Sequence, residues 1–354
     1  MAGSALSERQ CLMTRKSRLL TLLTAVLVLG SIAAFAVHHA AERADRRSRP
    51  QPGGPAVADG RVSLAAPAGA GRRMIFRSTA YGPHRDELAS VPAERPDAQR
   101  ATSGVKCLRF FAAGGTGICL RSAQGPLQNS YRAVVLDERL NERRSFPLAG
   151  VPSRARVSQS GHMVAWTVFV NGHSYGDTAF STRTSILDTR TWKLQDNLEE
   201  YDLKVDGHGY RSLDVNVWGV TFADDDHFYA TVSTRGQTYL AAGDVAANAL
   251  TTVHSNVECP SLSPDDTRIA YKKRVPGLPA DSPWRLYVLD LRTMTERATA
   301  EHSNIDDQAV WAADATLVYA RPGKFGTDLW TVPADGSGAP KQLASAALAP
   351  AFIG

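Results

Sequence analysis

The sequence is poor in the residues that build metal and redox centres. Its four cysteines stand at positions 11, 107, 119 and 259, and no two of them form a C-x-x-C pair. Its nine histidines include no H-x-x-x-H pair, whereas preformed zinc sites need closely spaced thiolates or imidazoles. We therefore expect no cofactor and no preformed metal site.

Nucleotide-binding motifs of common enzyme classes are absent as well. The chain has no P-loop and no dinucleotide-binding fingerprint. Its glycine-rich stretches at residues 114–117 and 335–340 fit turns between strands better than phosphate-binding loops. We therefore do not expect an enzyme.

Positive charge is scarce outside the N-terminal part. The net charge is +5, of which residues 1–18 carry +3 and residues 38–73 carry +4, so the remainder carries −2. Binding to a phosphate backbone requires a dense field of lysine and arginine. We therefore exclude nucleic acid as a partner.

One uncharged apolar stretch, residues 19–37, is long enough to cross a bilayer as a helix. Residues 1–18 are basic, which predicts a cytoplasmic N-terminus. The stretch is either an uncleaved signal anchor or a signal peptide cleaved near the small-x-small triplet at residues 34–36. We favour the anchor because the run exceeds a usual signal-peptide core. The rest of the chain then lies outside the cytoplasm at the cell membrane, and the alternative is a secreted protein.

Residues 38–71 are rich in proline, glycine, alanine and arginine and show no sustained hydrophobic period. This composition predicts a flexible linker. The folded domain is then expected to occupy residues 72–354.

A strand–turn–strand unit organises that domain, and its clearest copy lies in residues 259–297. Pro264 fixes φ in an S-P-D-D turn, while Asp265 and Asp266 can bond back to the local backbone. The flanking R-I-A-Y and R-L-Y-V-L runs are rich in residues that favour strands. Because so small a meander cannot bury its apolar faces alone, we expect it to recur.

The unit does recur. The turn and the strand after it are found in residues 111–120, 157–166, 222–231, 262–271 and 311–320. A later strand ends in an acidic or proline turn at Pro92, Asp137, Asp188, Asp244, Asp290 and Pro333. The steps between these six positions are 45, 51, 56, 46 and 43 residues. Six landmarks at this period predict an all-β fold, a six-bladed β-propeller of four-stranded antiparallel blades.

The two ends of the domain complement each other. The first blade has a second strand near residues 72–80 but a poor first strand before it, whereas residues 348–354 form a strand with no blade to follow. If the C-terminal strand pairs beside residues 74–78, the ring closes without an open edge. We therefore expect a closed propeller and a monomer.

Two blades are longer than the period requires, and the additions lie in residues 171–182 and 199–219. We expect these additions to project as loops, where the binding residues of propellers tend to lie. The candidate residues for binding a ligand or partner are His173, Tyr175, Asp177, Asp206, His208 and Tyr210. The sequence does not show that these six converge.

Two of the cysteines, Cys107 and Cys119, flank a turn centred near Ala113. Simple hairpin pairing would place them opposite each other on adjacent strands. Outside the cytoplasm they could form a disulfide, and the alternative is a pair of buried free thiols.

The runs S-L-S-P-D-D-T-R-I-A-Y-K-K and D-L-W-T-V-P-A-D-G-S-G-A-P-K-Q-L resemble the repeats of the TolB family. The resemblance covers about residues 72–354 and implies an envelope-located six-bladed propeller that acts through protein partners. TolB proteins carry an α/β domain before the propeller, and here only residues 38–71 separate the propeller from the apolar stretch. The implied variant is therefore membrane-anchored and lacks that domain.

Two functional hypotheses follow. The first is a membrane-tethered extracytoplasmic propeller that binds an envelope protein or peptide through its loops. The alternative is a propeller that binds a ligand or glycan, or acts as a hydrolase or lyase, at the mouth of its channel. The alternative requires carboxylates, histidines or a metal that converge on one face.

Overall fold

The computed structural model describes residues 15–50, 52–66, 69, 71–123, 130–172, 180–313 and 315–354. It divides into two compact units, residues 1–49 and residues 50–354. The first unit contains one long helix, α1 (Arg15–Ser48). By length and composition α1 can cross a membrane. Its large apolar side chains are exposed along the whole run. The hydroxyls of Thr21, Thr24 and Ser31 bond to the carbonyls four residues earlier, which satisfies them within the helix.

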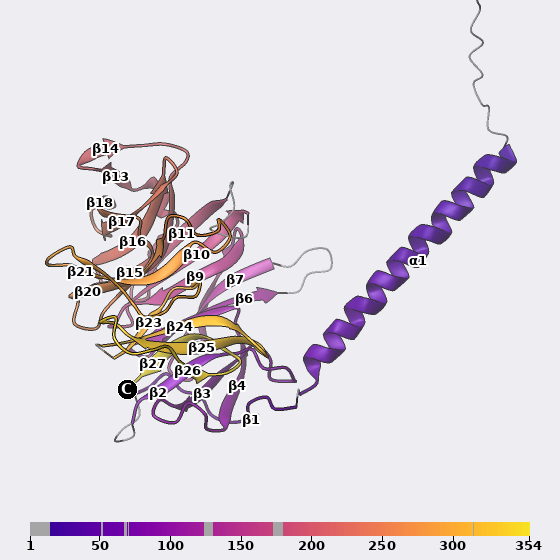
Figure 1. Ribbon diagram of the computed structural model, residues 1–354, viewed down its shortest axis with the longest axis horizontal. Coiled ribbons are helices and arrows are strands. Elements are labelled where there is room, and N and C mark those ends of the chain that lie inside the picture. The colour runs from indigo at the N-terminus through magenta and orange to yellow at the C-terminus, as the bar shows by residue number, and fades with distance from the viewer. Residues whose placement is uncertain are drawn as a thin grey trace, which may run out of the picture. The chain divides into compact units, whose positions relative to one another are not determined.

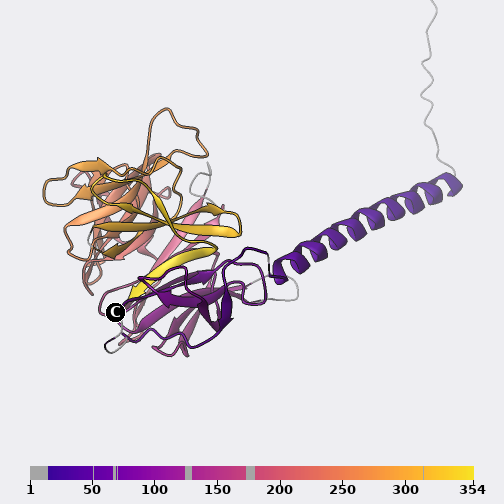
Figure 2. The same cartoon turned by 60° about the horizontal axis from the view of Figure 1, so that its bottom comes forward.

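The second unit is a six-bladed β-propeller, as the repeat predicted (Figures 1 and 2). Blade 1 contains β2 (Arg73–Ser78), β3 (Glu87–Pro92), β4 (Arg100–Lys106) and the C-terminal β27 (Ala347–Ile353). Blades 2 and 3 contain β5 (Arg109–Ala113), β6 (Thr116–Ala123), β7 (Ser130–Leu136) and β8 (Glu142–Leu148), then β9 (Val151–Val157), β10 (Met163–Asn171), β11 (Ser181–Asp188) and β12 (Leu194–Gln195).

Blades 4 to 6 repeat the same up-and-down order. They contain β15 (Asn216–Phe222), β16 (His227–Thr234), β17 (Gln237–Asp244) and β18 (Ala249–Ser255), then β19 (Glu258–Leu262), β20 (Arg268–Arg274), β21 (Trp284–Asp290) and β22 (Glu296–Ala298), then β23 (Val310–Ala313), β24 (Thr316–Gly323), β25 (Gly326–Pro333) and β26 (Lys341–Ala344). Each of the six landmark residues ends or directly follows the third strand of its blade, so the period is confirmed.

The ring closes between the two ends of the domain. β27 pairs antiparallel with β2, with Arg73 opposite Ile353 and Ser78 opposite Ala347. Figures 1 and 2 show the yellow C-terminal strand beside the indigo strands of blade 1. The predicted closure is therefore confirmed, and it removes the open edge that β2 would otherwise present.

Turn chemistry at the first hairpin of blade 5 follows the sequence pattern. Asp265 Oδ1 accepts hydrogen bonds from the Ser263 hydroxyl at 2.5 Å and from the Thr267 backbone N–H at 3.2 Å. The turn of blade 2 packs closely on the turn of blade 3, because a Cβ at Gly114 would stand 2.4 Å from the Ser160 carbonyl carbon. The glycine-rich stretch at residues 114–117 therefore serves a close hairpin contact.

Apolar side chains of each sheet pack against the next blade. Between blades 2 and 3, for example, Ile118 and Leu120 of β6 share a buried cluster with Val164 and Trp166 of β10. The hydrophobic core is thus spread around the ring in the spaces between sheets. This arrangement leaves the inner strands to line a central channel.

Two stretches differ from the expectation drawn from composition. Residues 38–48 of the expected linker continue α1, and β1 (Val57–Asp59) pairs parallel with β4 as an additional strand of blade 1. Leu64 is also buried, in a cluster with Phe110 and Leu136 of blade 2. Within the expected linker, Leu64 and β1 therefore contact the propeller, which the proline- and glycine-rich composition of residues 38–71 did not predict.

The second addition forms strands as well. After the short helix η1 (Leu198–Glu200), β13 (Asp202–Val205) pairs parallel with β18, and β14 (His208–Tyr210) pairs with β13. Blade 4 consequently has six strands. The expectation of a projecting loop at residues 199–219 is wrong, because Leu203 and Val205 are buried against the blade. Most of the other addition, residues 173–179, lies outside the described residues.

Candidate functional site: the two mouths of the central channel

The innermost strands β27, β5, β9, β15, β19 and β23 contact one another in order around the ring. Side chains alternate along them, so that in β9 Ala155 and Val157 pack between blades while Arg154 and Arg156 face the channel. Gln308 crosses the channel and donates to the carbonyls of Gly219 at 3.2 Å and Pro260 at 2.5 Å. A cavity lies at each end of the inner strands.

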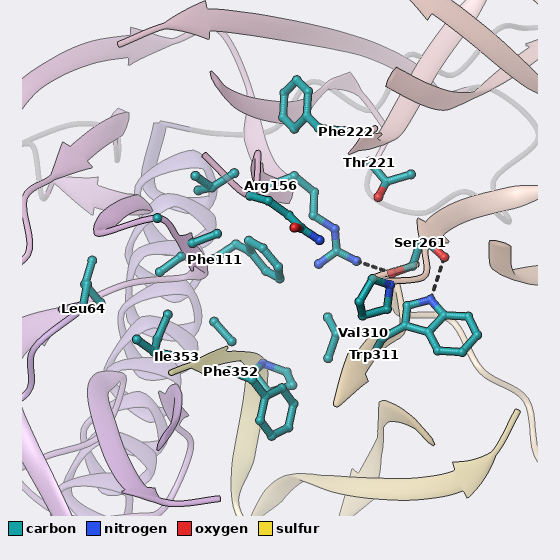
Figure 3. Close-up of a pocket in the computed structure, with 18 of the residues that line it drawn as sticks. Leu64, Phe111, Arg156, Thr221, Phe222, Ser261, Val310, Trp311, Phe352 and Ile353 are labelled. Carbon is teal, nitrogen blue, oxygen red and sulfur yellow. Dashed lines mark hydrogen bonds between the residues drawn. The ribbon is translucent and has the colours of Figure 1, made fainter. Parts of the chain in front are cut away.

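The larger cavity, which we call the aromatic mouth, has a volume of about 570 Å³ (Figure 3). Every one of the six inner strands contributes to its wall. Its principal side chains are Phe111, Arg156, Thr221, Phe222, Ser261, Val310, Trp311 and Phe352. The Trp311 indole N–H donates to the Ser261 carbonyl at 2.9 Å, so this ring is fixed in the wall.

Arg156 lies at the inner end of the aromatic mouth and is 6% exposed. Its Nη2 donates across the channel to the Ser261 hydroxyl at 3.2 Å and the Ala309 carbonyl at 2.8 Å. Its guanidinium carbon stands 4.5 Å from the centroid of the Phe111 ring. Burial lowers the pKa of Arg156 to about 10. The negative charge of Asp307 partly offsets this lowering, although the two side chains form no ion pair. The group therefore stays charged at neutral pH.

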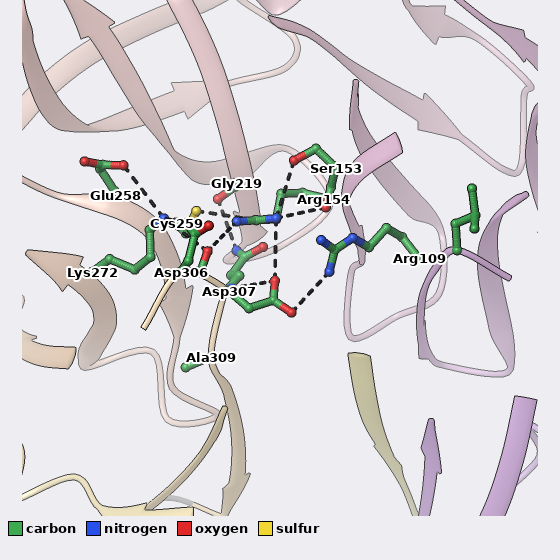
Figure 4. A network of polar contacts seen from close by, with 12 residues as sticks. Arg109, Ser153, Arg154, Gly219, Glu258, Cys259, Lys272, Asp306, Asp307 and Ala309 are labelled. Carbon is green, nitrogen blue, oxygen red and sulfur yellow. Dashed lines mark hydrogen bonds and ion pairs between the residues drawn. The ribbon is translucent and has the colours of Figure 1, made fainter. Parts of the chain in front are cut away.

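The smaller cavity, which we call the charged mouth, has a volume of about 420 Å³. Asp307 stands between two arginines there, with Oδ2 3.2 Å from Arg109 Nη1 and Oδ1 3.5 Å from Arg154 Nη1 (Figure 4). Burial raises the pKa of Asp307, but the two guanidiniums outweigh it and hold that pKa below its usual value. Arg109 and Arg154 are therefore both paired with the carboxylate of Asp307.

A second ion-pair set lies beside the charged mouth, on β19 and β20. Lys272 is fully buried, with Nζ 2.8 Å from Asp306 Oδ1 and 3.9 Å from Glu258 Oε2. Burial lowers the pKa of Lys272, but the neighbouring Cys259, Asp306 and Glu258 outweigh it, so the pKa lies above its usual value. Lys272 is therefore a paired structural cation.

The residues singled out from the sequence do not come together at either mouth. His173, Tyr175 and Asp177 lie outside the described residues. Asp206 and His208 lie in the β13–β14 hairpin at the outer edge of blade 4, where His208 Nδ1 is 2.9 Å from the Asp206 carbonyl oxygen. The Asp206 backbone N–H also donates to Thr252 Oγ1 of β18 at 3.1 Å, so these contacts hold the hairpin on blade 4.

Tyr210 lies at the end of the same hairpin. Its hydroxyl accepts a hydrogen bond from Thr234 Oγ1 at 3.0 Å, and the Arg235 guanidinium stands 4.3 Å from its ring centroid. Asp214 completes the group by accepting from the Arg235 backbone N–H at 2.7 Å. These contacts anchor the end of the hairpin to blade 4.

The cysteines of blade 2 are joined. Cys107 and Cys119 form a disulfide with a Cα–Cα separation of 5.4 Å, and the remaining described cysteine, Cys259, is buried and free. The bridge ties the entry of β5 to β6, the next strand of the same blade. A disulfide persists in an oxidising compartment.

Sequence reasoning missed the channel residues, although β9 carried a signal. In P-S-R-A-R-V the two arginines are two positions apart in an otherwise apolar strand, which is the pattern of a strand with one polar face. Asp306 and Asp307 precede β23 and lie at the channel, where their partners come from blades 2, 3 and 5.

The wall of the aromatic mouth consists mainly of aromatic rings, aliphatic side chains, hydroxyl groups and a buried arginine. The described residues that line it include no histidine and no cysteine. Among the residues that the structure describes, no group of three or more histidine, cysteine, aspartate or glutamate side chains is arranged to hold a metal ion. Aromatic faces and a fixed cation are suited to binding apolar and anionic groups.

No protein-family model matches the chain, and no curated protein matches its sequence. Solved structures do match its fold. TolB from Acinetobacter baumannii aligns with a TM-score of 0.51 and 16% identity, over 81% of this chain and 68% of that one. At this identity the likeness concerns the fold alone.

Two enzymes give lower scores. A puromycin-hydrolysing peptidase from Mycobacterium tuberculosis aligns with a TM-score of 0.49 and 14% identity, over 82% of this chain and 46% of that one. An oligogalacturonate lyase from Vibrio parahaemolyticus aligns at 0.45 and 10%, over 70% and 72%. These scores are too low to carry an argument. Six blades, closure by the C-terminal strand and the likeness to TolB together identify the fold of this chain as a TolB-like β-propeller.

Proposed function

We propose that the chain is a membrane-tethered extracytoplasmic propeller that binds an envelope protein by taking an exposed peptide segment into the aromatic mouth. The observation that carries the proposal is the cavity itself, about 570 Å³ in volume and walled by aromatic side chains from rigid strands. Cavities of this size and lining suit one or two apolar side chains of a partner.

Two further features support the location. Helix α1 is apolar and long enough to act as a signal anchor, and the disulfide between Cys107 and Cys119 suits an oxidising compartment. A cleaved signal peptide would give the same propeller in a secreted form. The propeller would then meet its partner outside the cytoplasm in either case.

The test fills each mouth in turn with the same substitution. Ala113 lines the aromatic mouth and Ala320 lines the charged mouth, and both are partly buried. The full chain in detergent, Ala113→Trp and Ala320→Trp would each be used to select binders from a phage-displayed random heptapeptide library. We expect enriched peptides that lose binding to Ala113→Trp and keep it with Ala320→Trp.

Circular dichroism melts of the three proteins serve as the folding control, because an unfolded variant would lose binding for a trivial reason. Should the enriched peptides bind all three folded proteins alike, the aromatic mouth is not the binding site. A failure to enrich any peptide on the unsubstituted chain would also reject the proposal.

A further inference from the structure

The aromatic mouth contains a buried cation without a carboxylate partner. Arg156 is in no ion pair with any residue that the structure describes, and its hydrogen bonds there come from Nη2 alone. A guanidinium has five N–H donors, so Nε and Nη1 remain without a described acceptor. Leaving a buried charge uncompensated costs free energy, and such sites persist where a ligand supplies the missing charge.

Another buried arginine of the propeller, Arg100, has a structural role. Arg100 is 2% exposed and also lies against an aromatic ring, at 4.9 Å from the Phe76 centroid. Its Nη1 donates to the Ala346 carbonyl at 2.9 Å, and its Nη2 donates to the Ser345 carbonyl. Both Nη atoms of Arg100 are thus used within the fold, whereas Arg156 keeps one Nη atom for the cavity.

The direction of the Arg156 side chain supports the same conclusion. In Figure 3 its guanidinium points from β9 into the space between Phe111 and Ser261. The other charged groups at the cavity lie near its rim. Glu138 and Asp266 are exposed, and Arg72 donates to the Ala312 carbonyl. Exposed rim charges are screened by salt, while a charge at the inner end is screened much less.

From these observations we infer that the aromatic mouth recognises a single peptide carboxylate, which pairs with Arg156 while a neighbouring apolar side chain packs on the aromatic wall. The exposed carboxylates of Glu138 and Asp266 disfavour a polyanion at the same entrance. The carboxylate can belong to a C-terminus or to an acidic side chain, since both present the same oxygens. This inference rests on the proposed function and specifies its ligand.

The experiment compares probes that differ by one charge. Isothermal titration of the full chain in detergent would use N-acetyl-glycyl-tryptophyl-glycine as the free acid and as the amide. A third probe, the amide with aspartate in the last position, carries the carboxylate on a side chain. We expect one or both carboxylate probes to bind at least about tenfold more tightly than the glycine amide, as charge-assisted bonds to a desolvated arginine allow.

Variants locate the effect. Arg156→Gln should lower the affinity for the carboxylate probes to that of the amide without changing amide binding, and Arg156→Lys should restore part of the difference. Arg109→Gln, at the charged mouth, should change none of the affinities. The comparison of acid with amide on the unsubstituted chain decides the question even if Arg156→Gln fails to fold.

The outcomes separate the two claims. Equal binding of the glycine amide and of both carboxylate probes, with all three lost in Ala113→Trp, overturns the carboxylate inference and leaves the proposed function standing. Binding of no probe, together with a failed peptide selection, rejects both. A preference for acid that survives in folded Arg156→Gln overturns the assignment to Arg156.

Discussion

The two mouths of the channel contain the same kind of cation in different surroundings. At the charged mouth Arg109 and Arg154 share the carboxylate of Asp307, and Lys272 nearby is paired with Asp306. At the aromatic mouth Arg156, two residues from Arg154 on the same strand, lies against the Phe111 ring and forms no ion pair with a described residue, since Asp307 acts on it only through space. One strand therefore presents a neutralised cation at one end and an unneutralised cation at the other.

This difference separates structural charge from recognition. A buried ion pair ties blades together, and its removal leaves a partner charge without compensation. An unpaired buried charge contributes no such bridge and lowers stability until a ligand arrives. Substitutions of the paired groups at the charged mouth should therefore lower stability, whereas substitution of Arg156 should change binding more than stability.

The largest loss of stability is expected from a truncation that removes part of the wall of both mouths. Removing residues 347–354 deletes β27, which supplies Leu348 to the charged mouth and Phe352 to the aromatic mouth. The edge of β2 is then exposed, and we expect loss of most of the folding free energy, on the order of 5 kcal/mol or more. Size-exclusion chromatography and thermal melts measure it. Removal of Gly354 alone is the control, and a truncated chain that melts like the full one would contradict ring closure.

Asp307→Asn tests the charged mouth. The substitution leaves Arg109 and Arg154 without their shared carboxylate, and we expect the free energy of unfolding to fall by about 3 kcal/mol. Urea unfolding of the full chain in detergent measures it. A change below about 1 kcal/mol would show that solvent already compensates these arginines.

Arg156→Met is the matched test at the aromatic mouth. It removes a charge that has no ion-pair partner among the described residues, at the cost of the bonds to Ser261 and Ala309. We expect the free energy of unfolding to change by no more than about 1 kcal/mol, in either direction. A loss comparable with that of Asp307→Asn would assign Arg156 a structural role and erase the contrast between the mouths.

Acid should weaken the charged mouth selectively. The pKa of Asp307 lies below its usual value in the folded state, so its contribution to stability is present above the unfolded pKa near 4 and is lost as pH falls below it. Between pH 5 and pH 3 the unsubstituted chain should lose about 1 kcal/mol more than Asp307→Asn. Arg156→Met should keep the slope of the unsubstituted chain, and equal slopes in all three would exclude Asp307 as the source.

The smallest effect is expected from metal removal. No described cluster of histidine, cysteine, aspartate and glutamate is arranged as a metal site, so we expect EDTA to shift the melting temperature by less than about 1 °C. A larger shift, reversed by calcium or zinc, would favour the alternative of a ligand-binding or catalytic channel mouth. It would also show that one of the two mouths carries a charge balance different from the one described.

The fold could be predicted closely because its signals are local or periodic. Pro264 and Asp265 determine a turn by their own chemistry, and the third-strand landmarks repeat at a fixed period. The additions to blades 1 and 4 could not be predicted in the same way. β1 and β13 join strands far along the chain through parallel pairing, and short stretches carry no signal for such a partner.

The channel site was beyond sequence reasoning for a related reason. Alternation in β9 shows which face Arg154 and Arg156 share, but the groups opposite them come from blades 5 and 6, more than 100 residues later. Whether an arginine forms an ion pair therefore depends on residues that lie far away in the sequence. The predicted binding residues Asp206, His208 and Tyr210 lie instead in a hairpin that is anchored to its own blade.

The pairing of β27 with β2 also affects the order in which the propeller folds. Residues 73–78 leave the ribosome long before residues 347–353, so the first blade keeps an unpaired strand edge until the last residues have been synthesised. Contacts so distant in sequence form slowly. A nascent propeller of this kind is therefore exposed to edge-to-edge association until β27 pairs with β2, and that pairing completes the wall of both cavities.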